Sequence, residues 1–207
     1  MTERGSAHAR VTLQPVAEDD LALVHRLTSD PSATGGHEWY GFRDPGPLRR
    51  RWAENGLLGE DGGMLIAAAG DERLGFVAWR RRDTARTSYC WTLGIALTPE
   101  ARGRGRGTVA QRELARYLFA HTQVNRVEAV TEIDNLAEQR ALEKAGFTRE
   151  GVLRGYGFQG GRWHDAVLYS LLRDGVDLAD APQLLSRGAG PGRGSRRPAG
   201  PRGRGRG

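Results

Sequence analysis

The most constraining feature of this sequence is a loop in which glycine fills every second position, Arg-Gly-Arg-Gly-Arg-Gly over residues 102–107. The apolar run at 88–97 predicts a strand before the loop, and apolar residues at helical spacing over 108–121 predict a helix after it. Glycines let backbone N–H groups approach a ligand closely, and the start of a helix carries a partial positive charge. A strand, a glycine-rich loop and a helix in this order predict a binding site for a diphosphate.

The arginines of this loop strengthen the prediction, because Arg104 and Arg106 would add positive charge for phosphate oxygens. An isolated Arg-Gly repeat is also typical of a flexible basic loop, and the strand and helix on either side favour the binding site over that alternative. The loop matches neither of two familiar phosphate binders. It lacks the Lys-Ser/Thr ending of a P-loop, and its glycines do not follow the G-x-G-x-x-G spacing.

Strand-like and helix-like segments alternate along the remainder of residues 10–175. We expect further strands at 11–15, 64–69, 74–80, 127–131, 152–158 and 163–172. We expect further helices at 19–30, 48–55 and 135–145, the last capped by Asn135 and ended by Gly146. This order predicts an α/β fold in which a mixed sheet carries helices on its faces, rather than a regular doubly wound fold.

The positive charge of the chain is concentrated at its C-terminal end. Residues 187–207 hold seven arginines and no acidic residue, so removing them turns the net charge of +6 into −1 for the remainder. A segment of Gly, Pro, Arg, Ser and Ala buries too little apolar surface to fold, and it is predicted to be disordered. We therefore divide the chain into a flexible N-terminus (1–9), one domain (10–175), a linker (176–186) and a tail (187–207).

Composition also indicates where the protein acts. A single cysteine, Cys90, excludes an internal disulfide and a cysteine-based zinc site, and we expect no bound metal. No segment approaches the roughly 20 apolar residues of a membrane helix, and residues 1–10 lack the apolar core of a secretion signal. We expect a cytoplasmic protein with no membrane contact. The basic tail suits weak contact with nucleic acid, although a solvated tail without a partner is the alternative.

The loop resembles the coenzyme A loop of the GNAT acetyltransferases, written Q/R-x-x-G-x-G/A, with Arg102, Gly105 and Gly107 at its defined positions. A second set of residues resembles the RimJ/RimL-type branch of that family: Asp134-Asn135, Lys144-Ala145-Gly146-Phe147, Glu150-Gly151, Arg154 and Asp165. The resemblance covers roughly residues 10–172. It implies the GNAT fold, an αβα sandwich around a mixed, mostly antiparallel sheet of about seven strands.

The resemblance also implies acetyl-CoA as co-substrate. The backbone of Ile95, Ala96 and Leu97 would line the thioester and the pantetheine arm, with one N–H stabilising the oxyanion that forms on attack. The diphosphate would be held by the loop and the start of its helix, through Arg102, Gly103, Arg104, Gly105, Arg106, Gly107 and Thr108. Asn135 would contact the pantetheine arm through its side-chain amide, or would only cap its own helix.

Attack by an amine needs a base, because an amine is mostly protonated at neutral pH, and the departing thiolate needs a proton. Many GNAT enzymes use a tyrosine seven residues after the Asn, where this chain has Leu142. Tyr156 is a substitute, although an aromatic residue there is also typical of packing. Glu38 is our candidate for the base or a substrate contact. His37, Trp39 and Tyr40 are expected in the acceptor pocket, and a solvated His37-Glu38 pair is the alternative.

These residues predict an N-acetyltransferase that acts on a primary amine, either a protein N-terminus or a small-molecule amine. An RNA- or ribosome-associated protein that uses its basic tail is one alternative function. Transfer of a longer acyl group, such as succinyl, is another, because the sequence does not fix the depth of the acyl pocket. A homodimer is compatible with the family.

Overall fold

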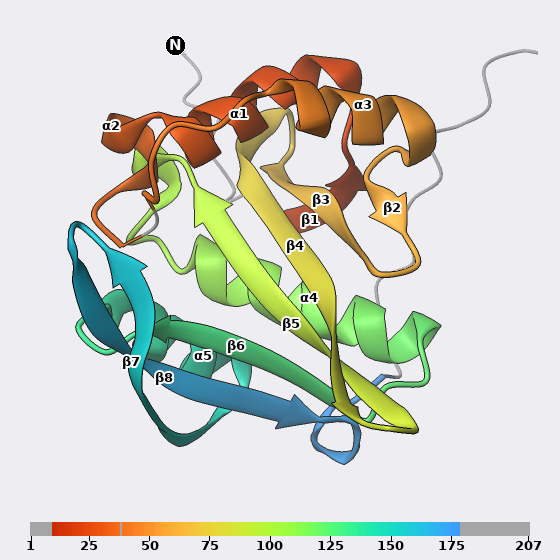
Figure 1. The fold of residues 1–207 in the computed structure, drawn as a ribbon. Helices are drawn as coiled ribbons and strands as arrows, with labels where there is room; N and C mark the ends of the chain where they lie inside the picture. The colour runs from red at the N-terminus through yellow and green to blue at the C-terminus, as the bar shows by residue number, and fades with distance from the viewer. Residues whose placement is uncertain (1–9, 38, 179–207) are drawn as a thin grey trace, which may run out of the picture.

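The computed structural model describes residues 10–37 and 39–178 (Figure 1). Glu38 and the predicted flexible N-terminus, most of the linker and the Arg/Gly-rich tail lie outside the described residues. The described strands are β1 (Val11–Pro15), β2 (Leu58–Gly59), β3 (Gly62–Ala69), β4 (Glu72–Ala85), β5 (Ser88–Leu97), β6 (Arg126–Glu132), β7 (Thr148–Gln159) and β8 (Arg162–Leu172). The helices are α1 (Leu21–Ser29), α2 (Pro31–Thr34), α3 (Gly46–Asn55), α4 (Arg106–His121) and α5 (Leu136–Ala145).

The strands form one mixed sheet in the order β1-β3-β4-β5-β6-β8-β7, and β2 pairs with β3 at the side. Figure 1 shows α1, α2 and α3 on one face of this sheet and α4 and α5 on the other. The expected αβα sandwich with a mostly antiparallel sheet is therefore confirmed. Among the described helices, none combines the length and the apolar character that a membrane span requires.

The strand β3 shows how the sequence produces two cores. Successive side chains of a strand point to opposite faces. Leu65 and Ala67 accordingly join the core beneath α4, while Ile66 and Ala68 join the core beneath α1. All four are almost completely buried. A strand covered on both faces is apolar throughout, which explains why this run shows no alternation with polar residues.

The parallel pair β5–β6 is short, and this positions the site. In the part of the chain that the structure describes, β5 and β6 pair only where Trp91, Thr92 and Leu93 lie opposite residues 127–129. Helix α4 makes the crossover connection that a parallel pair requires. Beyond Leu93 the two strands diverge: residues 94–97 keep their partners on β4 but have none on β6. The sheet therefore opens into a V at the end of β5.

A network of charged side chains links the strands β4, β6 and β7. The carboxylate of Glu128, whose side chain is 3% exposed, accepts from Arg82 Nε at 2.8 Å and from Arg126 Nε at 2.6 Å. Burial alone would raise the pKa of Glu128, but the two arginines outweigh it and lower that pKa below its usual range. Arg126 also donates to Glu150, and Ser170 Oγ donates to the same carboxylate at 2.6 Å.

This network makes the protein sensitive to acid. The hydrogen bond from Arg126, followed by that from Ser170, lowers the pKa of Glu150 to about 2. A carboxyl whose pKa is lowered by folding stabilises the fold above its unfolded pKa, and this contribution is lost as the pH falls through the folded pKa. The Glu150 side chain is 36% exposed, so solvent screening limits the contribution to about 1 kcal/mol.

We therefore expect Glu150→Gln to lower the free energy of unfolding by about 1 kcal/mol at neutral pH. The difference from the unchanged protein should shrink as the pH falls from about 4.5 to about 2, because the wild-type carboxylate is then protonated as well. Urea unfolding at a series of pH values measures both quantities. A difference that stays constant down to about pH 2 would contradict the assignment.

Candidate active site

The loop between β5 and α4 exposes a run of unpaired backbone donors. Among the described residues, none accepts a hydrogen bond from the N–H groups of residues 103–108. The first pairing after this run is Val109 N–H to the carbonyl oxygen of Gly105, at 3.2 Å. The start of a helix always leaves four such donors unpaired, here those of residues 105–108, and the preceding loop adds two more. Six consecutive donors beside the positive end of a helix dipole form a site for an anion.

Glycine is required at two positions of this loop. Gly103 and Gly105 have φ angles of +73° and +72°, in the left-handed region that most residues avoid. Gly105 is the N-cap of α4, so its conformation sets the direction in which the helix begins. Gly107 lies inside the first turn and has no such φ; an added Cβ there would contact Leu97 and Ile95 at ordinary distances. The Gly/Ala tolerance of the last motif position follows from this geometry.

The three arginines of the loop occupy different surroundings. Arg102 Nε donates to the carbonyl oxygen of Leu97 at 3.0 Å, and its Nη2 donates to the carbonyl oxygens of Ala33 and Thr34. Its guanidinium therefore ties the end of β5 to α2, and its predicted contact with the coenzyme stays a prediction. Arg106 Nη1 donates to Glu72 at 2.8 Å, whereas Arg104 is exposed at the surface.

Glu72 already pairs with Arg106, so a bound anion would compete with the Glu72 carboxylate for that arginine. The hydrogen bond from Arg106 lowers the pKa of the Glu72 carboxyl, and Arg104 adds a weaker effect of the same sign. The Glu72 side chain is half exposed, so an incoming phosphate can compete for Arg106 without leaving a buried charge unpaired. The loop is thus able to hold an anion with backbone donors and to recruit its arginines.

Helix α4 carries a buried side chain that the sequence did not single out. Gln111 is fully buried, and neither its amide oxygen nor its amide nitrogen has a partner among the described residues. Its Nε2 lies 4.0 Å from the position of a Cβ added to Gly107, on the helix face that packs against β5. A buried amide without hydrogen bonds costs about 1 to 3 kcal/mol.

Replacing this amide should therefore stabilise the protein. We expect Gln111→Leu, a change of similar volume, to raise the free energy of unfolding by about 1 to 2 kcal/mol. The melting temperature should rise by about 2 to 4 °C per kcal/mol. Calorimetry measures the shift, and Gln111→Glu, which buries a charge at the same place, should lower it. A leucine variant less stable than the wild type would show that Gln111 has a partner.

The remaining predicted cofactor residues lie around the V. Residues 95–97 are half-buried at its β5 arm, and Asn135 lies just beyond its β6 arm. Asn135 Oδ1 accepts from Glu138 N–H at 3.2 Å, so its capping role is confirmed. The amide nitrogen of Asn135 has no partner among the described residues, and its contact with the pantetheine arm stays a prediction. Leu142, at the position of the missing tyrosine, is completely buried.

The other candidates for acid–base chemistry differ in exposure. Tyr156 is 58% exposed on β7, in the irregular stretch where the pairing with β8 shifts register, so it is not a packing residue. Cys90 is fully buried, and this burial raises the pKa of its thiol. Asp165 Oδ1 accepts from the backbone N–H of Gly155 at 2.7 Å. The structure thus gives Cys90 and Asp165 structural surroundings and leaves Tyr156 free to contact a ligand.

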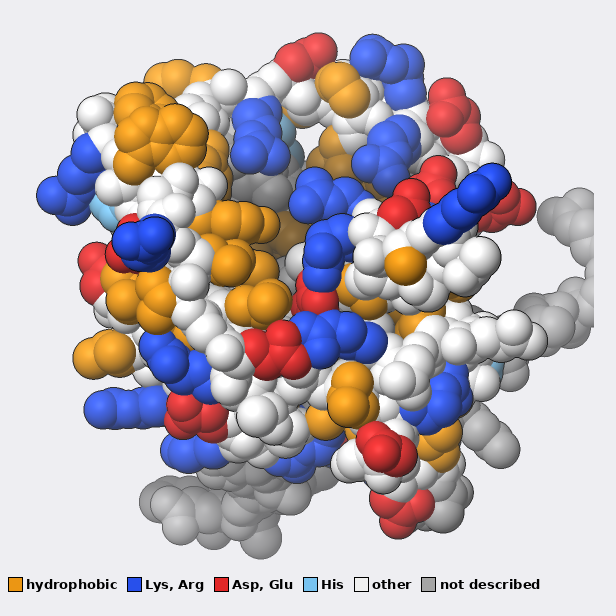
Figure 2. All heavy atoms as spheres, turned by 60° about the horizontal axis from the view of Figure 1, so that its bottom comes forward, with side chains coloured by type: hydrophobic (Ala, Val, Ile, Leu, Met, Phe, Trp, Pro, Cys, Tyr) orange, Lys and Arg blue, Asp and Glu red, His pale blue; other side chains and the backbone are white. Residues whose placement is uncertain are grey.

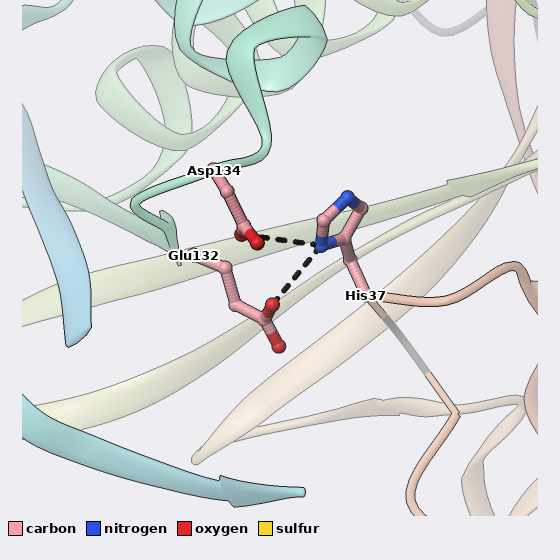
Figure 3. Close-up of side chains that lie close together, drawn as sticks. All are labelled: His37, Glu132 and Asp134. Carbon is pink, nitrogen blue, oxygen red and sulfur yellow. Dashed lines mark hydrogen bonds and ion pairs between the residues drawn. The ribbon is translucent and has the colours of Figure 1, made fainter. Parts of the chain in front are cut away.

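The structure also brings together a group of side chains from distant segments. His37, in the loop after α2, points its Nδ1 at the Oε2 of Glu132, 3.0 Å away, and at the Oδ1 of Asp134, 3.6 Å away (Figure 3). His164 of β8 places its own Nδ1 3.9 Å from the same oxygen of Glu132. Glu132 is the last residue of β6, and its side chain is only 12% exposed.

The loop that carries His37 is rich in aromatic side chains. Trp39 and Phe42 pack edge to face with centroids 5.6 Å apart, and Gln159 of β7 donates to the carbonyl oxygen of Trp39 at 2.9 Å. Tyr40 is half exposed. The loop is therefore fixed to the β7–β8 hairpin. Figure 2 shows one face of the molecule with a hollow, and hydrophobic, Lys or Arg, and Asp or Glu side chains lie around it.

Comparison with known families agrees with this geometry: a family model described as the acetyltransferase (GNAT) domain matches residues 10–148. These residues are more than half of the chain, so the protein belongs to the GNAT family of N-acetyltransferases. Acetyl-CoA is the co-substrate of that family. The family assignment made from the glycine-rich loop is confirmed, whereas the RimJ/RimL-like branch is not distinguished by this match.

Individual relatives agree with the family. YoaA of Bacillus subtilis (strain 168), an uncharacterized N-acetyltransferase, is 35% identical over 81 residues; the match covers 39% of this chain and less than half, 46%, of YoaA. The uncharacterized N-acetyltransferase p20 of Bacillus licheniformis is 27% identical over 168 residues, 79% of this chain and 93% of p20. The spermidine N-acetyltransferase of Vibrio cholerae, solved with CoA and spermine, has a TM-score of 0.67 at 18% identity, covering 80% and 96% of the two chains. At that identity the likeness shows the fold alone.

Sequence reasoning missed Glu132 and His164, and it named Asp134 only as part of the family resemblance. Glu132 directly follows the strand predicted at 127–131, and His164 lies near the start of the strand predicted at 163–172, with no motif that marks either residue as functional. The position of Asp134 next to the Asn135 cap was the only signal that the sequence offered for this group. The meeting of His37 with Glu132 depends on how the loop after α2 folds back over the sheet, across 95 positions of sequence.

Proposed function

We propose that this protein transfers the acetyl group of acetyl-CoA to a primary amine. One observation carries the proposal: six unpaired backbone donors at the start of α4 adjoin an unpaired edge of β5. The donors suit the diphosphate of coenzyme A. The strand edge suits the pantetheine arm, which follows the diphosphate in that molecule and contains amide groups. The residues present therefore fit the co-substrate of the family.

In this proposal each part of the site has one task. The N–H groups of residues 103–108 hold the diphosphate, and the edge of residues 94–97 aligns the pantetheine arm in the V. An N–H of this edge donates to the thioester oxygen and stabilises the negative charge that develops there during attack. Holding both reactants in the V replaces a bimolecular encounter by attack within a complex. The nitrogen of the amine bonds to the thioester carbon, and the carbon–sulfur bond then breaks.

The acceptor in this proposal is a compound with one reactive amine, either a small molecule or a protein N-terminus. Figure 2 shows both Lys or Arg and Asp or Glu side chains around the hollow, so this face lacks the uniformly acidic surface that a polycation would favour. The aromatic loop at 39–42 suits an acceptor with apolar or planar surface beside its amine. A protein N-terminus would agree with the RimJ/RimL-type residues Asn135, Lys144 and Phe147.

The test combines binding with turnover. Titration calorimetry should show CoA binding, and free-thiol release should follow when acetyl-CoA is mixed with one class among peptides, monoamines, amino sugars and polyamines. Succinyl-CoA in place of acetyl-CoA tests the longer acyl group. A protein that does not bind CoA would contradict the proposal. Release with polyamines alone would contradict the proposed acceptor class and leave the acetyl transfer standing.

Other parts of the proposal concern the whole protein. We place it in the cytoplasm, as its single buried cysteine and acetyl-CoA requirement favour, and we keep a homodimer as a proposal. The tail at 187–207 would add weak nucleic-acid contact. Deleting it should leave turnover unchanged and remove salt-sensitive RNA binding. If deletion abolished turnover, the tail would belong to the catalytic unit instead.

A further inference from the structure

We propose that His37 is the base that accepts a proton from the acceptor amine, with Glu132 as the residue that positions it. The inference rests on the proposed function. Its first support is the 3.0 Å contact between His37 Nδ1 and Glu132 Oε2. A carboxylate at this distance holds the proton on Nδ1, which leaves the lone pair of Nε2 as the proton acceptor. A base oriented by a carboxylate on its second nitrogen is the arrangement of hydrolytic triads.

The second support is the place of the pair in the fold. Glu132 ends the β6 arm of the V, three residues beyond the last position paired with β5. The strand rises about 3.3 Å per residue, so Glu132 lies roughly 10 Å along the diverging arm. Residues 94–97 form the opposite arm, along which the thioester would lie. A base at this opening faces the reacting groups, whereas a base on the outer face of the sheet would not.

The third support is the charge around the imidazole. Glu132 and Asp134 both face His37 Nδ1, so the imidazolium that forms on proton transfer meets two carboxylates. His164 of β8 places its Nδ1 3.9 Å from the same Glu132 oxygen, within ion-pair reach but beyond hydrogen-bond distance. His164 Nε2 either accepts from Arg162 Nε or donates to the carbonyl oxygen of Gln159, each 3.2 Å away, and either contact orients its ring. The contacts of His37 all use its Nδ1, and no described residue forms a hydrogen bond with its Nε2, which is therefore available to a ligand.

The proton balance is as follows. The acceptor enters as an ammonium ion and gives one proton to His37 Nε2. The neutral nitrogen attacks the thioester carbon, forming the C–N bond, and the C–S bond breaks with its electron pair remaining on sulfur. The second proton of that nitrogen moves through water to the thiolate, giving the amide and CoA with a free thiol. His37 then releases its proton to solvent, so each turnover liberates one proton.

The test compares variants that separate the base from its support. His37→Asn keeps a donor that can reach Glu132 but has no basic nitrogen, and His37→Ala opens a space for added imidazole. Glu132→Gln keeps the shape of the positioning residue and removes its charge. His25→Gln on α1, a histidine that takes no part in the contacts of the His37 group, is the control. Each variant is assayed for CoA affinity by calorimetry and for kcat/KM over a range of pH with the acceptor found for the wild type.

We expect His37→Asn to lower kcat/KM at neutral pH by about 100-fold or more, with CoA affinity unchanged. The loss should be under about tenfold for an acceptor amine that is already neutral at the assay pH, because its proton need not be removed. Imidazole should restore part of the activity of His37→Ala. Glu132→Gln should show a smaller loss and a shifted pH profile, and His25→Gln should match the wild type.

The outcomes are distinguishable. Absence of thiol release by the wild type with every acceptor would overturn the proposed function itself. Release that is unchanged in rate and pH profile in His37→Asn would overturn only the assignment of the base. Equal losses for protonated and neutral acceptors would give His37 a structural role instead. Loss of wild-type activity on chelation, restored by Zn²⁺ or Mn²⁺, would make the cluster a metal site and overturn the proposal.

Discussion

Gly105→Asp is expected to weaken CoA binding by at least about 100-fold, which corresponds to about 2.7 kcal/mol. Gly105 has a left-handed φ of +72° and caps α4, a conformation that Asp and Asn adopt more readily than other residues. The fold should therefore survive. The new carboxylate would take up the same N–H groups as the diphosphate and repel it; two unit charges about 5 Å apart interact by roughly 3 kcal/mol at an effective dielectric of 20.

Two variants separate charge from shape in this experiment. Gly105→Asn has the same size as the aspartate without its charge, and we expect it to lose less than about tenfold in affinity. Gly56→Asp introduces the acid at another left-handed glycine, φ +64°, at the end of α3, and CoA affinity should not change. Calorimetry with CoA measures all three. Equal affinity for Gly105→Asp and the wild type would show that the diphosphate binds elsewhere.

The fold could be read from the sequence where local patterns and long-range packing agree. Strands β1 and β5 begin and end where predicted. A charged or Pro-containing turn bounds each of them, and packing against the rest of the fold does not extend either strand beyond it. Helix α4 starts at Arg106, two residues before the prediction, because Gly105 in the left-handed region begins the helix earlier than the apolar pattern indicates. The strand β4 continues to Ala85, far beyond the apolar run, since its exposed residues 80–83 and 85 pair with β5.

The candidate site likewise has one part that the sequence predicts and one part that it does not. The phosphate loop is contiguous in sequence, so spacing alone defined it. The base is not: His37 meets Glu132 through a loop whose course depends on bonds such as that of Arg102 to α2 and of Gln159 to Trp39. Sequence reasoning paired His37 with its neighbour Glu38 because adjacency was the only relation it could measure. Contacts between strands and returning loops have no signature in the spacing of one sequence.

Gly75→Ala is expected to lower the free energy of unfolding by about 4 kcal/mol, which corresponds to a fall in melting temperature of roughly 10 °C. Gly75 of β4 has a φ of +146°, and a Cβ built there would lie 2.0 Å from the carbonyl oxygen of Ala96 and 2.8 Å from the Cα of Leu97. These neighbours are backbone atoms, so no side chain can rotate away. Relief requires the end of β5 to move, and that end is the arm along which the thioester would lie.

The functional consequence distinguishes this glycine from a second one with the same constraint. Gly62 also has a φ of +146°, and its added Cβ would lie 2.2 Å from the carbonyl oxygen of Trp79, toward the other end of β4. Gly62→Ala should lose comparable stability but keep the CoA affinity of the folded protein, whereas Gly75→Ala should lose both. Gly151→Ala, which meets no atom within 4 Å, controls for the change itself. Differential scanning calorimetry with and without CoA measures the two effects, because ligand binding raises the melting temperature of a folded protein. If CoA raised the melting temperature of Gly75→Ala as much as that of Gly62→Ala, β5 would not be the strand that holds the coenzyme.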